Sequence, residues 1–388
     1  MKRVIGICGI AIMGLMLSGC QTFNTEHGYG IVDYGNDNSD ALKNKMRQLL
    51  IEKNTVVSII QFGDAHTSTG YFIETLRHLM QQRFGNAGIG WMTPIAINRS
   101  AYQWDIINSQ NTLQTDFPMG GYIAKPKHNG AEIKVVLNSG QPRVGLWNVH
   151  LMLKSKTTEP ISILDTDGKA DLSYSLMNIE PNQWRVMNTV TTMPFSIRAD
   201  SQVELGGLWL QKHNQPGVIV SAVGMKDAQL VAWNQWSPQW LSELQMTNSD
   251  LVILEYGTNE ALDKNLDAQE YRTNLVTSIQ RIRKQLPNAV ILLLSPPDLM
   301  IQNQQKGTCV EHVPISYEIV KSTQIAVAKA ENLLYWDWQK AMGGRCNIAK
   351  WYSEGLAQKD LIHLTPLGYE ISAEILYQSL LQYWGIAK

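Results

Sequence analysis

The side chains that could do chemistry gather in four short motifs. They are Gly63-Asp64-Ala65-His66-Thr67, Val223-Gly224-Met225, Gly257-Thr258-Asn259-Glu260 and Asp360-Leu361-Ile362-His363. Carboxylate and imidazole groups can move protons, and amide groups can hydrogen-bond to a developing negative charge. Each motif alone is unspecific, because a glycine after a strand is usually a turn and a lone Asn or His is usually structural. Their order and their positions along the chain make the set more specific than its parts.

Three of these motifs directly follow segments that the sequence predicts to be buried strands. The segments are the apolar or β-branched runs Thr55–Phe62, Val218–Val223 and Leu251–Glu255. Parallel sheets place their functional sites at the carboxyl ends of strands. We therefore expect the loops after these three runs to converge, together with the residues just before His363.

Other segments complete an α/β pattern around these strands. Ser39 or Asp40 could cap a helix from about Ala41 to Glu52, and Ile73, Leu76, Leu79 and Met80 recur at helical spacing. Further helices are predicted at Gln269–Gln285, Tyr317–Ala330 and Leu367–Leu381, and further strands at Ala289–Leu294 and Leu333–Trp336. Strands that alternate with helices indicate a parallel sheet covered by helices.

The middle of the chain has a different texture. Short β-type runs separated by Gly, Pro, Asn and Asp lie at Glu132–Leu137, Val144–Leu153, Ile161–Leu164, Trp184–Thr192, Phe195–Arg198 and Val203–Leu210. Helical periodicity is weak there. This pattern is typical of an all-β sandwich or jelly roll inserted into the α/β domain.

The order of the four motifs resembles that of the SGNH (GDSL-type) hydrolase superfamily. The stretches Glu204–Trp209, Trp336–Gln339, Ala341–Gly344 and Gly355–Asp360 extend the likeness. With them the chain looks like periplasmic peptidoglycan O-acetylesterases that carry an inserted carbohydrate-binding-like β domain. The resemblance covers about residues 55–385, most strongly at the motifs.

The resemblance implies a fold and a division of the chain. The fold is α/β, a three-layer SGNH-type parallel sheet with an inserted all-β sandwich domain. Residues 50–100 and 213–388 are expected to be the two parts of the SGNH domain, and 101–212 the β sandwich. The residues before them are expected to be a lipoprotein signal peptide, 1–19, and a tether with an N-terminal helix, 20–49, on the N-terminal and helical patterns of the sequence.

The resemblance also implies a role for each motif residue. His363 would be the general base and then the acid, and Asp360 would hold its imidazole ring. The Gly224 N–H, the Asn259 amide and the N–H of residue 65 would form the oxyanion hole, with Asp64 as support in the first motif. The implied substrate is acetylated glycan or peptidoglycan, and neither metal nor cofactor is needed.

Position 65 departs from the family pattern, because it holds Ala where the family has its nucleophilic serine. A methyl group cannot attack an ester, and loss of the serine in a comparable hydrolase costs on the order of 10⁶ in turnover. Three explanations stay open. Ala65 is an introduced change, or it marks a natural glycan-binding pseudoenzyme, or another group such as His363-activated water, Thr67 or Ser68 performs the attack.

The N-terminus predicts a lipid-anchored protein. Lys2 and Arg3 precede an apolar run, Val4–Leu17, that is too short to span a membrane and suits a signal peptide. Leu17-Ser18-Gly19-Cys20 resembles a bacterial lipobox, which implies cleavage before Cys20 and lipidation of its thiol. The residue after Cys20 is Gln21 and not Asp. By resemblance to the sorting rules of bacterial lipoproteins, this points to the periplasmic face of the outer membrane.

Composition and individual residue types give further expectations about partners, a disulfide and sugar binding. A formal charge of −1 and the lack of a basic cluster argue against a nucleic-acid partner, whereas protein partners stay open. In the inferred oxidising compartment, Cys309 and Cys346 are expected to form a disulfide, with two separate buried thiols as the alternative. Trp209, Trp336 and Trp338 could stack on a sugar ring, but each is more readily explained as core.

Overall fold

The computed structural model describes residues 30–97, 103–112, 115–136, 145–158, 161–164, 170–174, 181–301 and 308–387. The predicted signal peptide, the lipidation site Cys20 and the first part of the predicted tether lie outside the described residues. Within the described residues, no helix is both long enough and apolar enough to cross a membrane.

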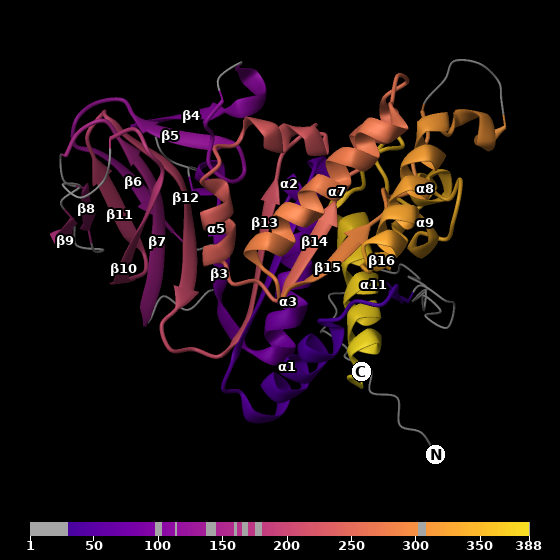
Figure 1. The fold of residues 1–388 in the computed structure, drawn as a ribbon, viewed down its shortest axis with the longest axis horizontal. Coiled ribbons are helices and arrows are strands. Elements are labelled where there is room, and N and C mark those ends of the chain that lie inside the picture. The colour runs from indigo at the N-terminus through magenta and orange to yellow at the C-terminus, as the bar shows by residue number, and fades with distance from the viewer. Residues whose placement is uncertain are drawn as a thin grey trace, which may run out of the picture.

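A large mixed sheet runs through the molecule (Figure 1). In order, its main path is β1 (Val32–Asp33), β16 (Leu334–Trp336), β15 (Val290–Leu294), β14 (Leu251–Glu255), β2 (Val56–Gly63), β13 (Gly217–Gly224), β3 (Asn86–Met92), β12 (Val203–Lys212), β5 (Tyr122–Pro126) and β4 (Trp104–Asn108). Beside β12 lies β7 (Leu146–Ser155), and β10 (Arg185–Thr192) pairs with β7. The strands from β16 to β3 are parallel, and β12 is antiparallel to β3.

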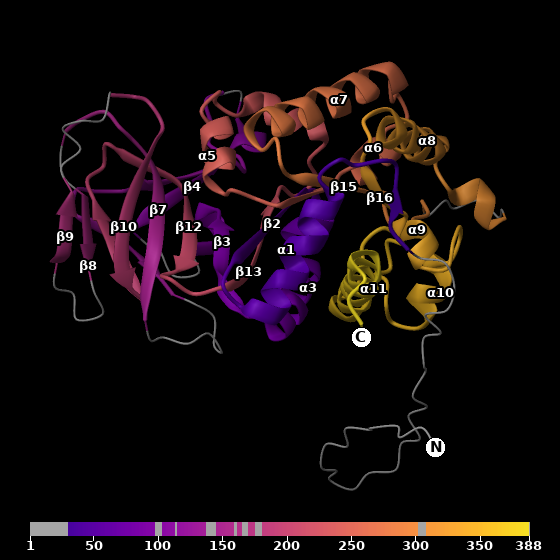
Figure 2. The same ribbon diagram turned by 60° about the horizontal axis from the view of Figure 1, so that its bottom comes forward.

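The central strands are almost wholly apolar because both faces of the sheet are covered. Every residue of β14 and of β15 is buried. In Figure 2, helices α1 (Ser39–Glu52), α3 (Tyr71–Phe84) and α11 (Pro366–Trp384) lie on one side, and α7 (Ala268–Gln285) and α8 (Ile315–Ala330) on the other. The predicted three-layer α/β class follows from this double cover.

Shorter helices connect these layers. They are α2 (Ala65–Ser68), α4 (Pro94–Ile97), α5 (Trp240–Met246), α6 (Thr258–Leu262), α9 (Trp338–Ala341) and α10 (Ile348–Ser353), with 3-10 turns at Ser109–Asn111, Leu230–Gln235 and Cys309–His312. The capping prediction for α1 was wrong. The helix begins at Ser39 after Asn38, so Ser39 and Asp40 lie inside its first turn.

The β-rich region is a sandwich that shares the large sheet. A second sheet has the order β6 (Ala131–Val135), β11 (Phe195–Ala199), β8 (Ile161–Leu164) and β9 (Ala170–Tyr174), with antiparallel pairing. Its Ile133 and Ile197 belong to one buried cluster with Leu151 of β7 and Leu205 of β12. The expected β sandwich is present, and one of its layers is the antiparallel end of the large sheet (Figure 1).

Strand β3 joins the two regions, and the sequence analysis did not predict it. Gly88 and Gly90 make the segment look like a turn, and both have positive φ angles, +142° and +82°. A Cβ added at Gly88 would lie 2.6 Å from the Leu210 carbonyl oxygen of the neighbouring strand. Gly88 is therefore needed for close backbone approach within the sheet, whereas a Cβ at Gly90 would meet the side chains of Ile219 and Ser221.

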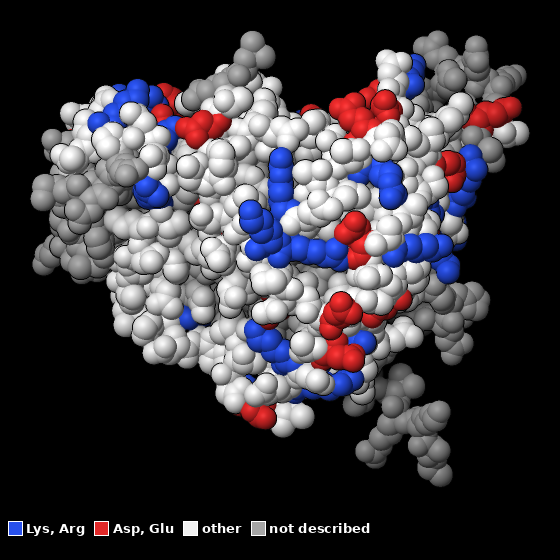
Figure 3. Space-filling model, in the orientation of Figure 1, with Lys and Arg blue, Asp and Glu red and all other residues white. Residues whose placement is uncertain are grey.

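Charged side chains of both signs are interspersed over the face shown in Figure 3. This view agrees with the near-neutral formal charge.

The structure joins Cys309 and Cys346 through a disulfide bond, with their Cα atoms 6.0 Å apart. The bond links the turn that precedes α8 to the segment between α9 and α10, 37 residues further along the chain. Both cysteines pack against the main core.

Opening this disulfide should destabilise the folded chain. Closing a loop of 37 residues restricts the unfolded chain by about 4 kcal/mol in the chain-entropy account. We expect a reductant, or Cys309→Ser combined with Cys346→Ser, to lower the free energy of unfolding measured with urea. The double variant should not respond to reductant. Equal unfolding midpoints for the oxidised and reduced chains would contradict the prediction.

Candidate functional site

Three neighbouring strands end at the same level of the sheet. The register pairs Gly63 at the end of β2 with Gly224 of β13 on one side and with Glu255 of β14 on the other. The Met225 N–H donates to the Gly63 carbonyl at 3.0 Å, and the Asp64 N–H donates to the Glu255 carbonyl at 3.2 Å. The structure thereby brings together the loops that follow Phe62, Val223 and Glu255.

The turn that carries Ala65 leaves β2 directly into helix α2. Asp64 caps this helix, because its Oδ1 accepts the His66 N–H at 2.9 Å. Ala65 is the first helical residue and is 6 % exposed. Gly224 lies against the same helix, and a Cβ added there would be 2.5 Å from the Ser68 backbone nitrogen. Glycine is therefore required at position 224 for the strand to approach the turn this closely.

Asp360 and His363 form an imidazole–carboxylate pair just before α11. His363 Nδ1 lies 2.7 Å from Asp360 Oδ2, and Asp360 Oδ1 accepts the backbone N–H groups of Ile362 and His363, each at 3.0 Å. Leu361 has a left-handed φ of +59°, which closes this tight loop. Desolvation by burial acts to raise the pKa of Asp360, but these hydrogen bonds outweigh it and lower the pKa. An ionised carboxylate only accepts, so Nδ1 carries the proton and Nε2 is left as the basic nitrogen.

The pair lies beside the turn that holds Ala65. The His363 ring centroid is 5.5 Å from that of His66, the residue next to Ala65. His66 is buried, its Nδ1 is 2.9 Å from the Tyr369 hydroxyl, and its ring makes a T-shaped contact with Trp338. Desolvation by burial, reinforced by nearby His363, lowers the pKa of His66 to about 3. The sequence analysis assigned His66 no role, although it follows position 65 directly.

Asn259 lies near the start of α6, four residues beyond the end of β14. Its Nδ2 donates to the Ala228 carbonyl at 3.0 Å, which fixes the amide and uses one of its two N–H groups. Gly257, with a φ of +129°, turns the chain from the strand into the helix. Asn259 thus follows the strand adjacent to β2, and its role as an oxyanion donor stays a prediction.

A group of buried carboxyls lies beneath the turn, and two of its members were missed by the sequence analysis. Desolvation by burial raises the pKa of Asp64 to about 7 and that of Glu260 to about 7, and it raises the pKa of Glu255 well above its usual value. Glu260 Oε1 accepts the Leu230 N–H at 2.8 Å. The signal for Glu255 was present in the sequence, as the acidic end of an otherwise apolar strand.

The hydroxyls of Thr67 and Ser68, the other groups considered as replacement nucleophiles, are both hydrogen-bonded. Thr67 is only 1 % exposed. Its hydroxyl accepts a hydrogen bond from Gln61 Nε2 and donates one to Glu255 Oε2, each at 2.7 Å. The Ser68 hydroxyl donates back to the Ala65 carbonyl at 3.2 Å. Both hydroxyls therefore serve the local structure of α2.

The three candidate sugar-stacking indoles belong to the core. Trp209, Trp336 and Trp338 are 2 %, 0 % and 1 % exposed. With so little exposed surface, none of them presents a ring face to a ligand.

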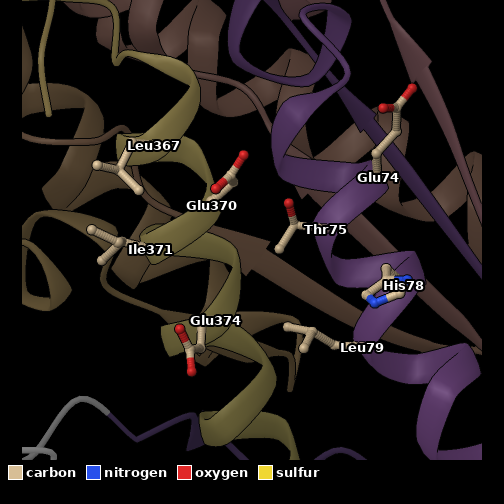
Figure 4. A pocket seen from close by; sticks show the side chains of 8 residues that line it. All are labelled: Glu74, Thr75, His78, Leu79, Leu367, Glu370, Ile371 and Glu374. Atoms are coloured by element: carbon tan, nitrogen blue, oxygen red, sulfur yellow. The ribbon is translucent and has the colours of Figure 1, made fainter. Parts of the chain in front are cut away.

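An open groove of about 500 Å³ lies near the site, between α3 and α11 (Figure 4). Its lining residues are Glu74, Thr75, His78, Leu79, Leu367, Glu370, Ile371 and Glu374. In Figure 4, Glu370 of α11 and Thr75 of α3 point toward each other across the groove. Neither Ala65 nor the Asp360–His363 pair lines it. Within the described residues, no group of three or more His, Cys, Asp or Glu side chains is arranged to hold a metal ion.

The parallel sheet and its carboxyl-end motifs define a class of protein, the SGNH hydrolase fold. Comparison with known families agrees. Residues 199–371 match the GDSL-like lipase/acylhydrolase family, and residues 87–196 match the peptidoglycan O-acetylesterase N-terminal family. No curated protein matches the chain.

Solved structures add a match over nearly the whole chain. A peptidoglycan O-acetylesterase is similar with a TM-score of 0.80 and 29 % identity, over 92 % of this chain and 99 % of that one. A family two carbohydrate esterase from Cellvibrio japonicus is similar with a TM-score of 0.31 and 11 % identity, over 76 % of this chain and 98 % of that one, which is too slight a likeness to argue from. The chain is thus an SGNH (GDSL-type) hydrolase-fold protein that combines a GDSL-like acylhydrolase domain with a peptidoglycan O-acetylesterase N-terminal domain.

The buried environment of His66 predicts that its ring stays neutral where an ordinary histidine titrates. The unfolded chain takes up this proton near pH 6.5, whereas the folded pKa is about 3. The contribution of His66 to stability should therefore be lost as the pH falls from about 6.5 to about 3. In NMR spectra of the histidine ring nitrogens, we expect one set of signals that does not shift between about pH 4 and about pH 8. The substitution His66→Gln should remove these signals. A His66 signal that titrates near neutral pH would contradict this.

Proposed function

We propose that this chain is a peptidoglycan O-acetylesterase-like protein whose site receives the O-acetyl esters of cell-wall glycan, and that Ala65 leaves it without its nucleophile. The observation that carries the proposal is the Asp360–His363 pair. Its imidazole lies beside the ring of His66, and therefore beside the turn where the family has its serine. The match to a peptidoglycan O-acetylesterase over nearly the whole chain supports the substrate class.

With a hydroxyl at position 65, His363 can carry each proton that the reaction moves. His363 Nε2 takes the hydroxyl proton as the oxygen attacks the acetyl carbonyl carbon, and Asp360 stabilises the resulting imidazolium. The imidazolium then protonates the departing sugar oxygen, which leaves the acetyl group on the enzyme. Water, deprotonated by His363, releases acetate and restores the hydroxyl. Asp360 suits this role because it is ionised and hydrogen-bonded on both oxygens.

The carbonyl oxygen becomes negative during each attack and needs fixed donors. We assign these to the N–H of residue 65, the N–H of Gly224 and the side-chain amide of Asn259. Gly224 and the turn that carries Ala65 are adjacent through the β13–β2 register and the close approach of Gly224 to Ser68. Asn259 is anchored by its bond to the Ala228 carbonyl, so its orientation is set before substrate arrives.

A second candidate function is glycan binding at the same site without catalysis. The acid–imidazole pair and the glycine-lined strand ends persist although the hydroxyl is absent. This favours a non-catalytic glycan-binding pseudoenzyme or scaffold at the outer membrane as the alternative. In either case the protein is anchored through lipidated Cys20 at the periplasmic face of the bacterial outer membrane.

Restoring the hydroxyl distinguishes these functions. We expect Ala65→Ser to release acetate from O-acetylated peptidoglycan, and the chain with Ala65 to be slower by on the order of 10⁶. Ala65→Gly is the matched control, because it changes the same position without supplying a hydroxyl. Equal release by the unaltered chain and by Ala65→Ser would refute the missing-nucleophile proposal. No release by either, together with retention on the glycan, would favour the binding function.

If the Asn259 amide donates to the oxyanion, removing it should slow turnover. In the Ala65→Ser background, Asn259→Ala should lower kcat by about 10²–10³-fold, because one fixed donor to the transition state is removed. Asn274→Ala, on the outer helix α7, is the control. Acetate release at the rate of the parent variant would show that the Asn259 amide does not act on the reacting carbonyl.

A further inference from the structure

A chain of buried polar side chains lies directly beneath the turn that carries residue 65, and the mechanism above does not use it. We propose that Glu255 is a positioning residue that holds this turn in place by accepting a hydrogen bond from the Thr67 hydroxyl. The consequence for turnover rests on the proposed function, whereas the consequence for the turn itself does not.

The contacts link three elements that meet at the site. Gln61 Nε2 of β2 donates to Thr67 Oγ1 of α2 at 2.7 Å, and Thr67 Oγ1 donates to Glu255 Oε2 of β14 at 2.7 Å. Each of the three residues is only 1 % exposed. Since α2 is a single turn of helix, this one hydroxyl connects it to both β2 and β14.

Gly63 packs directly against two of these groups. A Cβ added at Gly63 would overlap both Thr67 Oγ1 and Glu255 Oε2. The glycine before Asp64 therefore makes room for the Thr67–Glu255 hydrogen bond. The Asp64 N–H also donates to the Glu255 carbonyl, so the backbone and the side chain of Glu255 both hold the turn.

The surroundings of Glu255 favour its neutral form. In the described part of the chain, the titratable groups that face it are Asp64, Glu260, Tyr256 and Tyr369. None of these supplies a positive charge. Desolvation by burial, with the nearby Asp64 carboxyl, raises the pKa of Glu255 well above its usual value. A neutral acid still offers the carbonyl oxygen that the Thr67 hydroxyl requires.

The turn must be held precisely because, in the Ala65→Ser variant, residue 65 would supply both the attacking atom and one oxyanion donor. A displacement of about 1 Å can cost about 10²-fold in rate. Substrate need not contact Glu255 for this to matter. Loss of its hydrogen bond should therefore lower kcat and leave KM unchanged.

The first arm of the test measures acetate release by the full chain carrying Ala65→Ser. Glu255→Ala and Thr67→Val should each lower kcat by about 10- to 100-fold at constant KM. Glu255→Gln, which keeps a neutral acceptor, should recover most of the rate. Glu243→Ala is the matched control, because Glu243 is a fully buried glutamate that accepts the Met119 N–H outside the site. Equal damage by Glu255→Gln and Glu255→Ala, or no damage by Glu255→Ala, would overturn the proposal.

The second arm uses the chain with Ala65 and does not depend on activity. Amide hydrogen exchange is measured at Ser68 and Thr69, whose N–H groups bond to the carbonyls of Asp64 and Ala65. Glu255→Ala and Thr67→Val should accelerate it, whereas Glu255→Gln and Glu243→Ala should not. Infrared spectra should contain a buried carboxylic-acid band that Glu255→Gln removes. Unchanged exchange would overturn the proposal even if the Ala65→Ser variant proved inactive, and absence of that band would contradict the neutral state of Glu255.

Discussion

The common end level of β13, β2 and β14 is the constraint on which the rest of this site depends. A parallel register fixes which residues of neighbouring strands lie side by side, and here it aligns Gly224, Gly63 and Glu255. Two of these three positions tolerate no side chain, because the backbone of α2 and the Thr67–Glu255 bond occupy the space. The turn that carries Ala65 is therefore positioned by contacts of its neighbours and does not rely on the side chain at position 65.

The site uses carboxyl groups in two opposite electrostatic states. Asp64, Glu255 and Glu260 lie beneath the turn, where burial raises their pKa values and favours the neutral acid. Asp360 is partly exposed, and hydrogen bonds from His363 and the backbone keep its pKa low. The buried group can thus serve structure without strong charge repulsion, while the exposed carboxylate keeps the negative charge that orients an imidazole ring.

Ala65 fits this arrangement without disturbing it. It is almost fully buried at the start of α2, and the contacts that hold the helix come from Asp64, Thr67 and Ser68. Under the proposed function, a single missing hydroxyl separates this chain from the set of groups that an esterase needs. This explains why motifs on both sides of position 65 could be identified although the nucleophile itself is absent.

The sequence by itself determined the α/β class and the central strands, because continuous apolar runs are local signals. The pairing of Asp360 with His363 was expected from the resemblance of the motif order to the SGNH hydrolases, and the structure contains it. Only the tertiary structure showed that β3 joins the sandwich to the parallel sheet, because its glycines look like a turn until the neighbouring backbone is present. It also decided the states of His66 and Glu255. Their burial depends on residues as distant in sequence as Tyr369 and Thr67, and desolvation has no signature in a linear pattern.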